Sequence, residues 1–472
     1  MNYKITTNLM QHQRDAVEKL NSVKVAALFM DMGTGKTLTA FEWLRRKSRK
    51  ISKVLYFCPV SVKKTIANQI EQHTDATYYV FDDKTKQEKI PQADFYIIGI
   101  ESMSDSDRMK LCANSLVDDN AAITVDESTY IKNHYAKRTE WITRIGKAAK
   151  YRMIMTGTPM SNGFKDIFSQ MYFLSPLILG YNSFFSFAAN HLEYSKKFPG
   201  VVKRAHSTEL LAKKMQPYVY QVKKSECLDL PEKSYSSRYY SLTPLQAQVY
   251  QARKDEFFYL IEKYEEVSSN AIFNLFTDLQ KICSGYWHDE NKERIEAKHW
   301  RIDVLKEIIA EIPENEKVVI WAKYMHDIDG ILAALRAEYG NDCASEYTGR
   351  KNEKERAIEA DLFAKHRRFF VGTQATGGHG LNELVCSGYA IFYNNNFKFG
   401  ERLQAEDRQH RLGMGNSVHY INIIASNTID ERIEKSLDKK EGILLSFQRE
   451  IQEIRKLKSG SDKKLKEVLK KL

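Results

Sequence analysis

The sequence lacks the cysteine spacings that mark zinc sites and disulfide frameworks. Its six cysteines are scattered over 472 residues, and no two of them form a Cys-x-x-Cys pair. We interpret them as reduced core residues of a cytosolic protein. His379 has no cysteine or histidine nearby at ligand spacing, so we expect a loop residue there rather than a metal ligand.

Long apolar runs are missing as well. No stretch approaches the ~18 consecutive apolar residues that span a bilayer, and the N-terminus has no apolar segment of the signal-peptide kind. We therefore expect a cytoplasmic protein with no membrane partner.

Acidic residues are fewer than basic ones. The chain has 61 Asp and Glu against 72 Lys and Arg, a net charge of +11. This balance favours a polyanionic partner such as nucleic acid, although some basic proteins are merely soluble. With 43% hydrophobic residues there is ample material for packed cores, which excludes global disorder. The length suggests about three units of ~150 residues, or two larger lobes.

The most prominent motif in the sequence is a glycine turn. Residues 30–38 read Met-Asp-Met-Gly-Thr-Gly-Lys-Thr-Leu, between an apolar run at 25–29 and helical spacing at 39–44. Such a strand, turn and helix aims backbone N–H groups and a helix N-terminus at one point, whose usual occupant is a polyphosphate. The strict P-loop pattern has glycine where Met30 stands, and the short Gly-x-Gly-Lys-Thr core also arises by chance.

We predict that this turn binds ATP. Lys36 would pair with the β- and γ-phosphates, and the Thr37 hydroxyl would ligate Mg²⁺. The expected ATP-binding residues of the turn are Met32, Gly33, Thr34, Gly35, Lys36 and Thr37.

The helix expected from residue 9 precedes this turn and carries Gln13. A glutamine can pair with two hydrogen-bonding edges of adenine, so Gln13 is a candidate for selecting the base. The alternative is an ordinary capped surface helix.

A second anchor is the run 121–128, Ala-Ala-Ile-Thr-Val-Asp-Glu-Ser. An apolar strand that ends in two acids places Asp126 to hold Mg²⁺ and Glu127 to orient or deprotonate the attacking water. Two such acids alone could cap a following helix. Their position after the glycine turn favours the catalytic interpretation.

Other expected strands end in hydroxyl, lysine or glycine residues, at 53–59, 152–155 and 369–373. Groups of these kinds at the carboxyl ends of strands suit phosphate contacts with nucleic acid. A flexible loop is the alternative for the glycines near 377. The candidate contacts are Pro59, Ser61, Lys63, Thr156, Thr158, Thr373, Gly377 and Gly378. The alternation of strands and helices predicts an α/β fold with parallel, doubly wound sheets.

Residues 401–413 have helical spacing, with Gly413 expected to end the helix. Gln404, Arg408 and Arg411 stand at i, i+4 and i+7, on one face. A solvated basic face would explain the two arginines by itself.

Several of these motifs together resemble a known family. Residues 32–37, 126–133 and 156–162 are similar to motifs I, II and III of the SWI/SNF-type ATPases of helicase superfamily two. Ile131-Lys132-Asn133 distinguishes them from generic DEAD-box helicases. Residues 377–382 and 404–413 resemble motifs V and VI, so the resemblance covers about residues 9 to 435.

The resemblance implies two RecA-like parallel-sheet lobes with helical insertions. The expected divisions are 1–160 for the first, ATP-binding lobe, 161–230 for a first helical insertion, 231–298 for a linker and second helical insertion, 299–437 for the second lobe, and 438–472 for a basic helical tail. The tail would dock on a lobe, bind nucleic-acid phosphates or recruit a protein partner.

The resemblance also implies an activity. It implies a monomeric DNA-dependent ATPase, of compact bacterial or viral form, that uses ATP and Mg²⁺ to move along double-stranded DNA and remodels branched DNA or displaces bound protein. A strand-separating DNA or RNA helicase is the alternative. Arg408 and Arg411 would neutralise the γ-phosphate. The implied catalytic residues are Lys36, Asp126, Glu127, Gln404, Arg408 and Arg411.

Three positions depart from the family pattern. Thr129 replaces the usual histidine of motif II, which affects the coupling between motifs II and III. Met414 replaces glutamine, and residues 220–223 replace a segment with paired arginines. Neither Thr129 nor Met414 removes a catalytic group.

Overall fold

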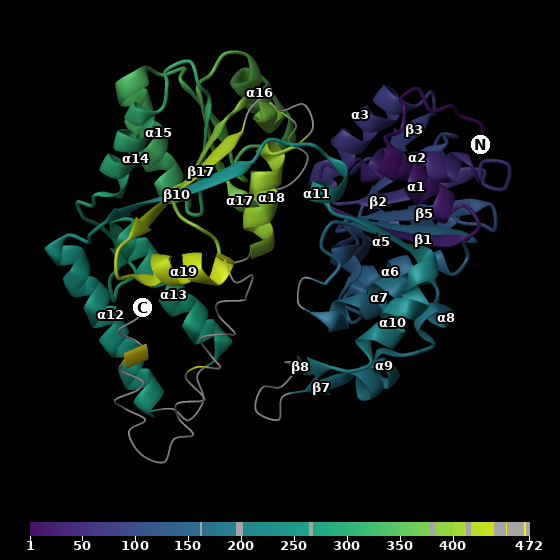
Figure 1. Ribbon diagram of the computed structural model, residues 1–472, viewed down its shortest axis with the longest axis horizontal. Helices are drawn as coiled ribbons and strands as arrows, with labels where there is room; N and C mark the ends of the chain where they lie inside the picture. Colours follow the sequence, from purple (N-terminus) through teal and green to yellow (C-terminus); the bar gives the residue numbers. More distant parts are fainter. Residues whose placement is uncertain are drawn as a thin grey trace. The chain divides into compact units, whose positions relative to one another are not determined.

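The chain folds into two compact units, Met1–Asp229 and Leu230–Leu472 (Figure 1). The computed structural model describes residues 1–160, 163–194, 202–263, 268–377, 381, 383–397, 399–411, 417–438, 450 and 467–468. Each unit contains one large sheet of parallel strands with helices packed against it. The predicted α/β class, with two parallel-sheet lobes, is confirmed.

The first unit is organised around a seven-stranded parallel sheet. Its strands, in spatial order, are β3 (Tyr78–Val80), β4 (Phe95–Gly99), β2 (Lys53–Cys58), β5 (Ala121–Asp126), β6 (Tyr151–Thr156), β1 (Val25–Met30) and β9 (Val219–Val222). Alternate residues of β2 belong to two different hydrophobic cores. Leu55 and Phe57 pack on one face of the sheet, and Val54 and Tyr56 pack on the other. Burial on both faces explains why these strands read as continuous apolar runs.

The helices of the first unit cover this sheet and continue beyond it (Figure 1). They are α1 (Gln11–Lys19), α2 (Lys36–Arg45), α3 (Lys63–His73), α4 (Ser102–Asp105), α5 (Asp107–Ser115), α6 (Lys137–Gly146), α7 (Ile167–Leu174), α8 (Pro176–Leu179), α9 (Phe184–His191), α10 (Thr208–Met215) and α11 (Lys224–Cys227). Short 3-10 turns lie at Val60–Val62, Gln87–Lys89, Ser128–Ile131, Phe164–Asp166 and Gln216–Tyr218. A hairpin, β7 (Leu192–Tyr194) with β8 (Val202–Ala205), follows α9.

Strand β9 differs from the sequence prediction, which placed residues 161–230 in a helical insertion. It pairs in parallel with β1, from Ala27↔Val219 to Met30↔Val222, and so belongs to the main sheet. A four-residue strand has too little length to show a period in the sequence. Its place is decided by β1, whose backbone groups it pairs.

The second unit has a six-stranded parallel sheet. Its strands, in spatial order, are β10 (Lys233–Tyr240), β17 (Val418–Ala425), β16 (Tyr389–Phe392), β13 (Val318–Ala322), β15 (Phe369–Thr373) and β14 (Ala344–Tyr347). Strand β10 falls in the range 231–298 that the sequence predicted as linker and helical insertion. Instead it pairs along its whole length with β17, from Lys233↔Val418 to Tyr240↔Ala425. Its polar sequence suits an edge strand, and hides it from a search for apolar runs.

Helices of the second unit surround this sheet or pack beside it (Figure 1). They are α12 (Pro244–Lys263), α13 (Ser269–Cys283), α14 (Arg301–Glu311), α15 (Met325–Tyr339), α16 (Glu353–Lys365), α17 (Gln374–Gly377), α18 (Phe399–Gln409) and α19 (Ile429–Asp438). A hairpin joins β11 (Tyr286–His288) to β12 (Arg294–Glu296), and a 3-10 turn lies at Glu383–Cys386. Tyr250 and Phe257 of α12 share a core with Ile272 and Phe276 of α13.

Within these described residues, no helix has the length and apolar character needed to cross a membrane. The basic tail predicted for 438–472 lies outside the described residues, apart from positions 438, 450, 467 and 468.

Candidate functional site

The carboxyl ends of four neighbouring strands define the candidate site of the first unit. Strands β2, β5, β6 and β1 are adjacent and parallel, so the segments that follow them emerge at one edge of the sheet. These segments are the loop after Cys58, the acidic pair, the loop after Thr156 and the glycine turn. Ligands of open α/β sheets bind at this edge.

The glycine turn requires its glycines. Gly33 and Gly35 have φ values of 81° and 78°, in the left-handed region that other residues avoid. A Cβ on Gly35 would also stand 2.1 Å from the side-chain nitrogen of Gln13. Helix α2 begins directly afterwards, at Lys36, so its N-terminal N–H groups face the turn.

The Lys36 ammonium lies over this turn. Its Nζ donates to the carbonyl oxygens of Met30, at 2.9 Å, and Asp31, at 3.1 Å. Its charge also acts on Asp126, the acid predicted to hold the metal. The lysine and the buried acid are therefore close enough to act on one phosphate and its cation.

Helix α1 packs on the outside of the turn. His12 Nε2 lies 2.8 Å from the carbonyl oxygen of Thr34, and the Gln13 amide donates to the carbonyls of Thr34 and Gly35 at 3.4 and 3.3 Å. Gln13 Oε1 accepts the N–H of Met10 at 2.8 Å. Both side chains are buried. The structure thus brings Gln13 to the predicted site, where it supports the turn; adenine selection stays a prediction.

Asp126 ends β5, and the residue is only 7% exposed. The Tyr56 hydroxyl donates to its Oδ2 at 3.3 Å and lies within hydrogen-bonding reach of the Thr37 hydroxyl. Burial, with the neighbouring Glu127, raises the pKa of Asp126 to about 7. A buried carboxylate beside a threonine hydroxyl is a set of hard oxygen donors, which fits the predicted Mg²⁺.

Glu127 occupies a strained position. Its φ of 49° is in the left-handed region, and its N–H donates to Asp126 Oδ1 at 2.9 Å. Such strain costs about 1–3 kcal/mol and persists only where the surroundings enforce it. The Glu127 carboxylate lies at the strand end of β6, where the Thr156 hydroxyl donates to Glu127 Oε2 at 3.4 Å.

Thr156 corrects one prediction. The sequence suggested a nucleic-acid contact, but Thr156 is fully buried and its hydroxyl faces Glu127. Its hydroxyl therefore contacts the acidic pair and is not accessible at the surface. The next residue, Gly157, lies against the glycine turn: a Cβ there would stand 3.4 Å from both the Met30 carbonyl oxygen and the Met32 nitrogen.

The other predicted nucleic-acid residues of this unit differ in accessibility. Ser61 and Thr158 are exposed, whereas Pro59 is buried. Lys63 donates to the Phe81 carbonyl oxygen at 2.7 Å, so its ammonium is already engaged. Ser61 and Thr158 are therefore the exposed members of the set, and the DNA contacts of all of them stay predictions.

In the second unit, Thr373 ends β15 and donates to the Thr376 hydroxyl at 2.9 Å. Gly377 was predicted to let a phosphate approach, but a Cβ there would stand 2.3 Å from the indole ring of Trp321. Tight packing on Trp321 is thus a structural reason for this glycine. Gly378 lies outside the described residues, as do His379, Gly413 and Met414.

The arginine segment is only partly the predicted helix. Helix α18 contains Gln404 and Arg408 but ends at Gln409, so Arg411 follows the helix instead of continuing its stripe. The Arg411 N–H donates to the Gln409 carbonyl oxygen at 3.0 Å, which is a tight turn rather than a helical bond. His410 contributes to this ending, because its ring bonds the Pro231 carbonyl oxygen at 2.7 Å.

Sequence reasoning missed two buried residues beside the acidic pair. Tyr56 and Gln170 stand inside apolar segments, and neither belongs to a motif. The only signal in the sequence was that each residue carries a polar group within an otherwise apolar run. A polar group that is buried requires a hydrogen-bond partner.

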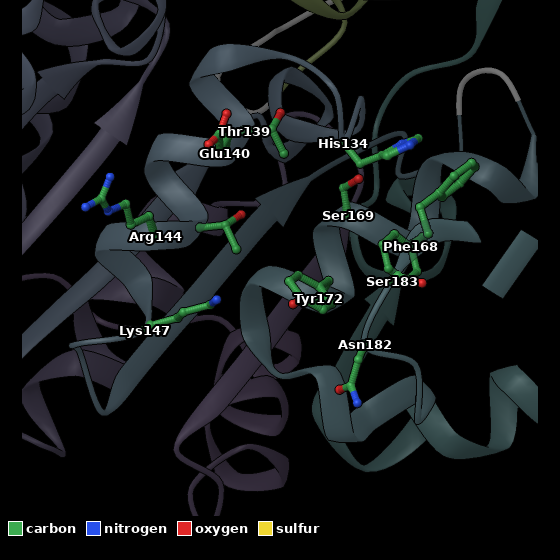
Figure 2. A pocket seen from close by; sticks show the side chains of 12 residues that line it. His134, Thr139, Glu140, Arg144, Lys147, Phe168, Ser169, Tyr172, Asn182 and Ser183 are labelled. Carbon is green, nitrogen blue, oxygen red and sulfur yellow. The ribbon is translucent and has the colours of Figure 1, made fainter. Parts of the chain in front are cut away.

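A separate cavity lies elsewhere in the first unit (Figure 2). Its volume is ≈ 480 Å³, and Phe168, Tyr172 and Phe184 contribute aromatic rings to its lining. Arg144 of α6 and Lys147, which follows that helix, lie across from Phe168 and Tyr172 in this view. None of the predicted ATP or nucleic-acid residues lines it, so it is distinct from the candidate site.

The two parallel sheets and the glycine turn with its acidic pair define the class: an α/β protein with P-loop nucleotide-binding architecture. The family described as SNF2-related domain matches residues 12–286. The chain belongs to this family, as its motifs predicted.

Individual relatives agree with this assignment. The chain is 28% identical over 317 residues to an uncharacterized ATP-dependent helicase of Mycoplasma pneumoniae, covering 66% of this chain and 29% of that protein. It is 26% identical over 327 residues to the human SWI/SNF-related matrix-associated actin-dependent regulator of chromatin subfamily A member 1, covering 66% and 30%. The chain thus spans less than a third of either relative.

Among solved structures, the chain is similar to the SWI2/SNF2 ATPase core of Sulfolobus solfataricus in complex with double-stranded DNA. The TM-score is 0.45 and the identity 23%, covering 98% of both chains. The name of the Mycoplasma pneumoniae relative, an ATP-dependent helicase, accords with the prediction of an ATP hydrolase.

Proposed function

We propose that the chain is an ATP-dependent motor on double-stranded DNA, which hydrolyses ATP when it is bound to DNA and moves along the duplex. The observation that carries this proposal is the meeting of Lys36, Asp126 and Glu127 at one edge of the first sheet, in a chain of the SNF2-related family.

Each of these residues has a role in the proposed reaction. The backbone of the glycine turn and Lys36 bind the phosphates, while Thr37 and Asp126 would hold Mg²⁺. The bound cation supplies positive charge to the phosphates. Glu127 orients the attacking water and accepts its proton. From the resemblance we assign Gln404, Arg408 and Arg411 to the γ-phosphate, where an arginine neutralises charge on the transferred group.

DNA is the partner that the charge and the family support. The net charge of +11 favours a polyanion, and exposed Ser61 and Thr158 follow strands β2 and β6, at the sheet edge where the ATP residues follow β1 and β5. We propose that these loops contact the DNA backbone, so that the nucleotide and DNA sites share one sheet edge.

Strand separation is the alternative, and the relatives from Mycoplasma pneumoniae and Mycoplasma genitalium are named uncharacterized ATP-dependent helicases. Such an enzyme would have the same ATP chemistry but would part the duplex as it moves.

An ATPase panel tests the proposal. Rates would be measured with duplex, single-stranded, forked and four-way DNA and with duplex RNA, with Glu127→Gln as the inactive control. We expect duplex DNA to stimulate hydrolysis, and salt to weaken the stimulation steeply because phosphate contacts release counterions. Equal rates with and without every DNA would refute the motor, and stimulation by RNA alone would favour an RNA helicase.

A further inference from the structure

We propose that Gln170 is a positioning residue that couples the loop after β5 to the loop after β6. It lies in α7, within the apolar sequence Ile-Phe-Ser-Gln-Met-Tyr-Phe-Leu, and is fully buried. A buried amide without partners costs several kcal/mol, so such a residue persists in a core only where its hydrogen bonds are made.

The partners of Gln170 come from both loops. The Ser128 hydroxyl donates to Gln170 Oε1 at 2.7 Å, and Gln170 Nε2 donates to the Pro159 carbonyl oxygen at 2.8 Å. A further bond to the Asp166 carbonyl oxygen, also 2.8 Å, fixes the amide to the start of α7. One side chain thus joins the residue after Glu127 to the residue after Thr158.

The hydrogen bonds of Gln170 to Ser128 and to Pro159 are each shorter than the direct hydrogen bond from Thr156 to Glu127, which is 3.4 Å long. Ser128 is itself fully buried, so water cannot readily replace a broken bond there. A displacement of the Pro159 loop must therefore carry the Ser128 loop with it, or leave a buried polar group unpaired.

The coupling matters because the two loops face different partners. Glu127 is the proposed water-orienting residue, and Thr158 is an exposed candidate for DNA contact. Thr129 stands where the family usually has the histidine associated with coupling these motifs. Gln170 lies outside both motifs, and its hydrogen bonds connect them through α7 in this chain.

The inference rests on the proposed function, and kinetics test it. Gln170→Met removes both hydrogen-bonding groups at similar volume, and Ser128→Ala removes the partner. We expect either change to lower the DNA-stimulated kcat about tenfold while the KM for ATP changes less than about twofold, because the nucleotide contacts stay and only the positioning of Glu127 is lost.

The matched control is Gln246→Met. Gln246 is equally buried, and its amide bonds the Ile282 carbonyl oxygen at 2.6 Å in the second unit. A double variant, Ser128→Ala with Gln170→Met, should be no slower than the worse single variant, since one link is broken only once. Multiplied losses in the double variant, or an equal loss of kcat in Gln246→Met, would overturn the coupling.

Hydrogen–deuterium exchange gives a readout that does not depend on turnover. In the wild-type chain, a non-hydrolysable ATP analogue should slow exchange in the segments 127–131 and 157–160 together. In Gln170→Met, only the first segment should respond. Joint protection in the variant would refute the link, whereas a wild type without DNA-stimulated hydrolysis would refute the motor and leave this measurement interpretable.

Discussion

Asp126 holds a carboxylate at the end of a strand whose six residues are all buried. Burial and the adjacent Glu127 disfavour its charged form, and the nearby Lys36 favours it. The Tyr56 hydroxyl adds a donor to Oδ2. At the scale of single residues, the candidate site is therefore a small set of charges in a poorly hydrated place, where each has a distinct effect on binding or on chemistry.

Two variants separate these effects. Lys36→Ala should weaken ATP binding together with turnover, because it removes a phosphate contact. Glu127→Gln should bind ATP with an affinity near that of the wild type but lower kcat by at least about 100-fold, because the amide cannot accept the proton of the attacking water. Equilibrium binding of a fluorescent ATP analogue, measured beside hydrolysis, distinguishes the two. Loss of ATP binding in Glu127→Gln would show that this carboxylate belongs to the binding site.

Asp327, in the second unit, is a buried acid outside the candidate site. It accepts hydrogen bonds from Asn394 and, at 3.3 Å, from Ser284. Burial raises its pKa to about 7, and the positive charge of Arg301 only partly offsets this. Between about pH 4 and pH 7 the folded chain holds this proton while the unfolded chain has released it. Its contribution to stability is therefore present at low pH and is lost as the pH rises toward 7.

Asp327→Asn should remove this dependence. The stability of the variant relative to the wild type should improve by about 2 kcal/mol between pH 5 and pH 8, because asparagine has no proton to release. Calorimetric Tm values of both proteins at the two pH values measure the change, with Asp329→Asn, an exposed substitution in the same helix, as the control. A constant difference between variant and wild type would contradict the raised pKa.

Strand β10 and helix α18 are joined at the scale of elements by one buried acid, Glu406. It accepts hydrogen bonds from Arg402 at 2.8 Å, Tyr235 at 2.8 Å and Lys233 at 3.1 Å. Burial acts to raise the pKa of Glu406, but Arg402 and Lys233 hold it below its usual value. The acid thus attaches the edge strand to the helix that carries Arg408.

Glu406→Gln should destabilise the second unit by about 2–4 kcal/mol, because Arg402 would lose the buried anion that compensates it and Lys233 would keep only Asp407, at 3.5 Å. Chemical denaturation followed by tryptophan fluorescence measures this. Lys435→Gln is the control, since the Lys435 side chain that pairs with Glu431 is 72% exposed and pairs with such a partner contribute about 0–1 kcal/mol. Equal stability of the two variants would mean that the network around Glu406 contributes little.

At the scale of the whole molecule, the proposed motor has two sheet-based units and a surplus of positive charge. No strand-separating wedge is evident in the sequence. We therefore expect ATP-dependent displacement of a triplex-forming third strand from duplex DNA, with little unwinding of a plain forked duplex. A translocase that pulls duplex at a junction can rewind one arm as it unwinds another, so branch migration is also expected.

Gel assays with labelled third strands and labelled forks distinguish movement from strand separation. Glu127→Gln serves as the control for dependence on hydrolysis. Efficient unwinding of a tailed duplex without triplex displacement would identify a conventional helicase.

The sequence by itself determined the glycine turn, the acidic pair and the parallel α/β class. These features depend on near neighbours: Gly33 and Gly35 are needed for a local backbone conformation, and a strand buried on both faces must be apolar along its length. The candidate ATP residues of the first unit could therefore be named, and the structure brings them to one sheet edge.

Only the tertiary structure decided the places of β9 and β10, the end of α18 at Gln409 and the hydrogen bonds of Gln170. Each depends on a partner elsewhere in the chain. The edge strands β9 and β10 are each defined by the neighbouring strand with which they pair. His410, at the end of α18, is bonded to the Pro231 carbonyl oxygen, 179 residues away. The role of a buried amide depends on which donors and acceptors the fold brings to it, and spacing along the sequence does not contain that information.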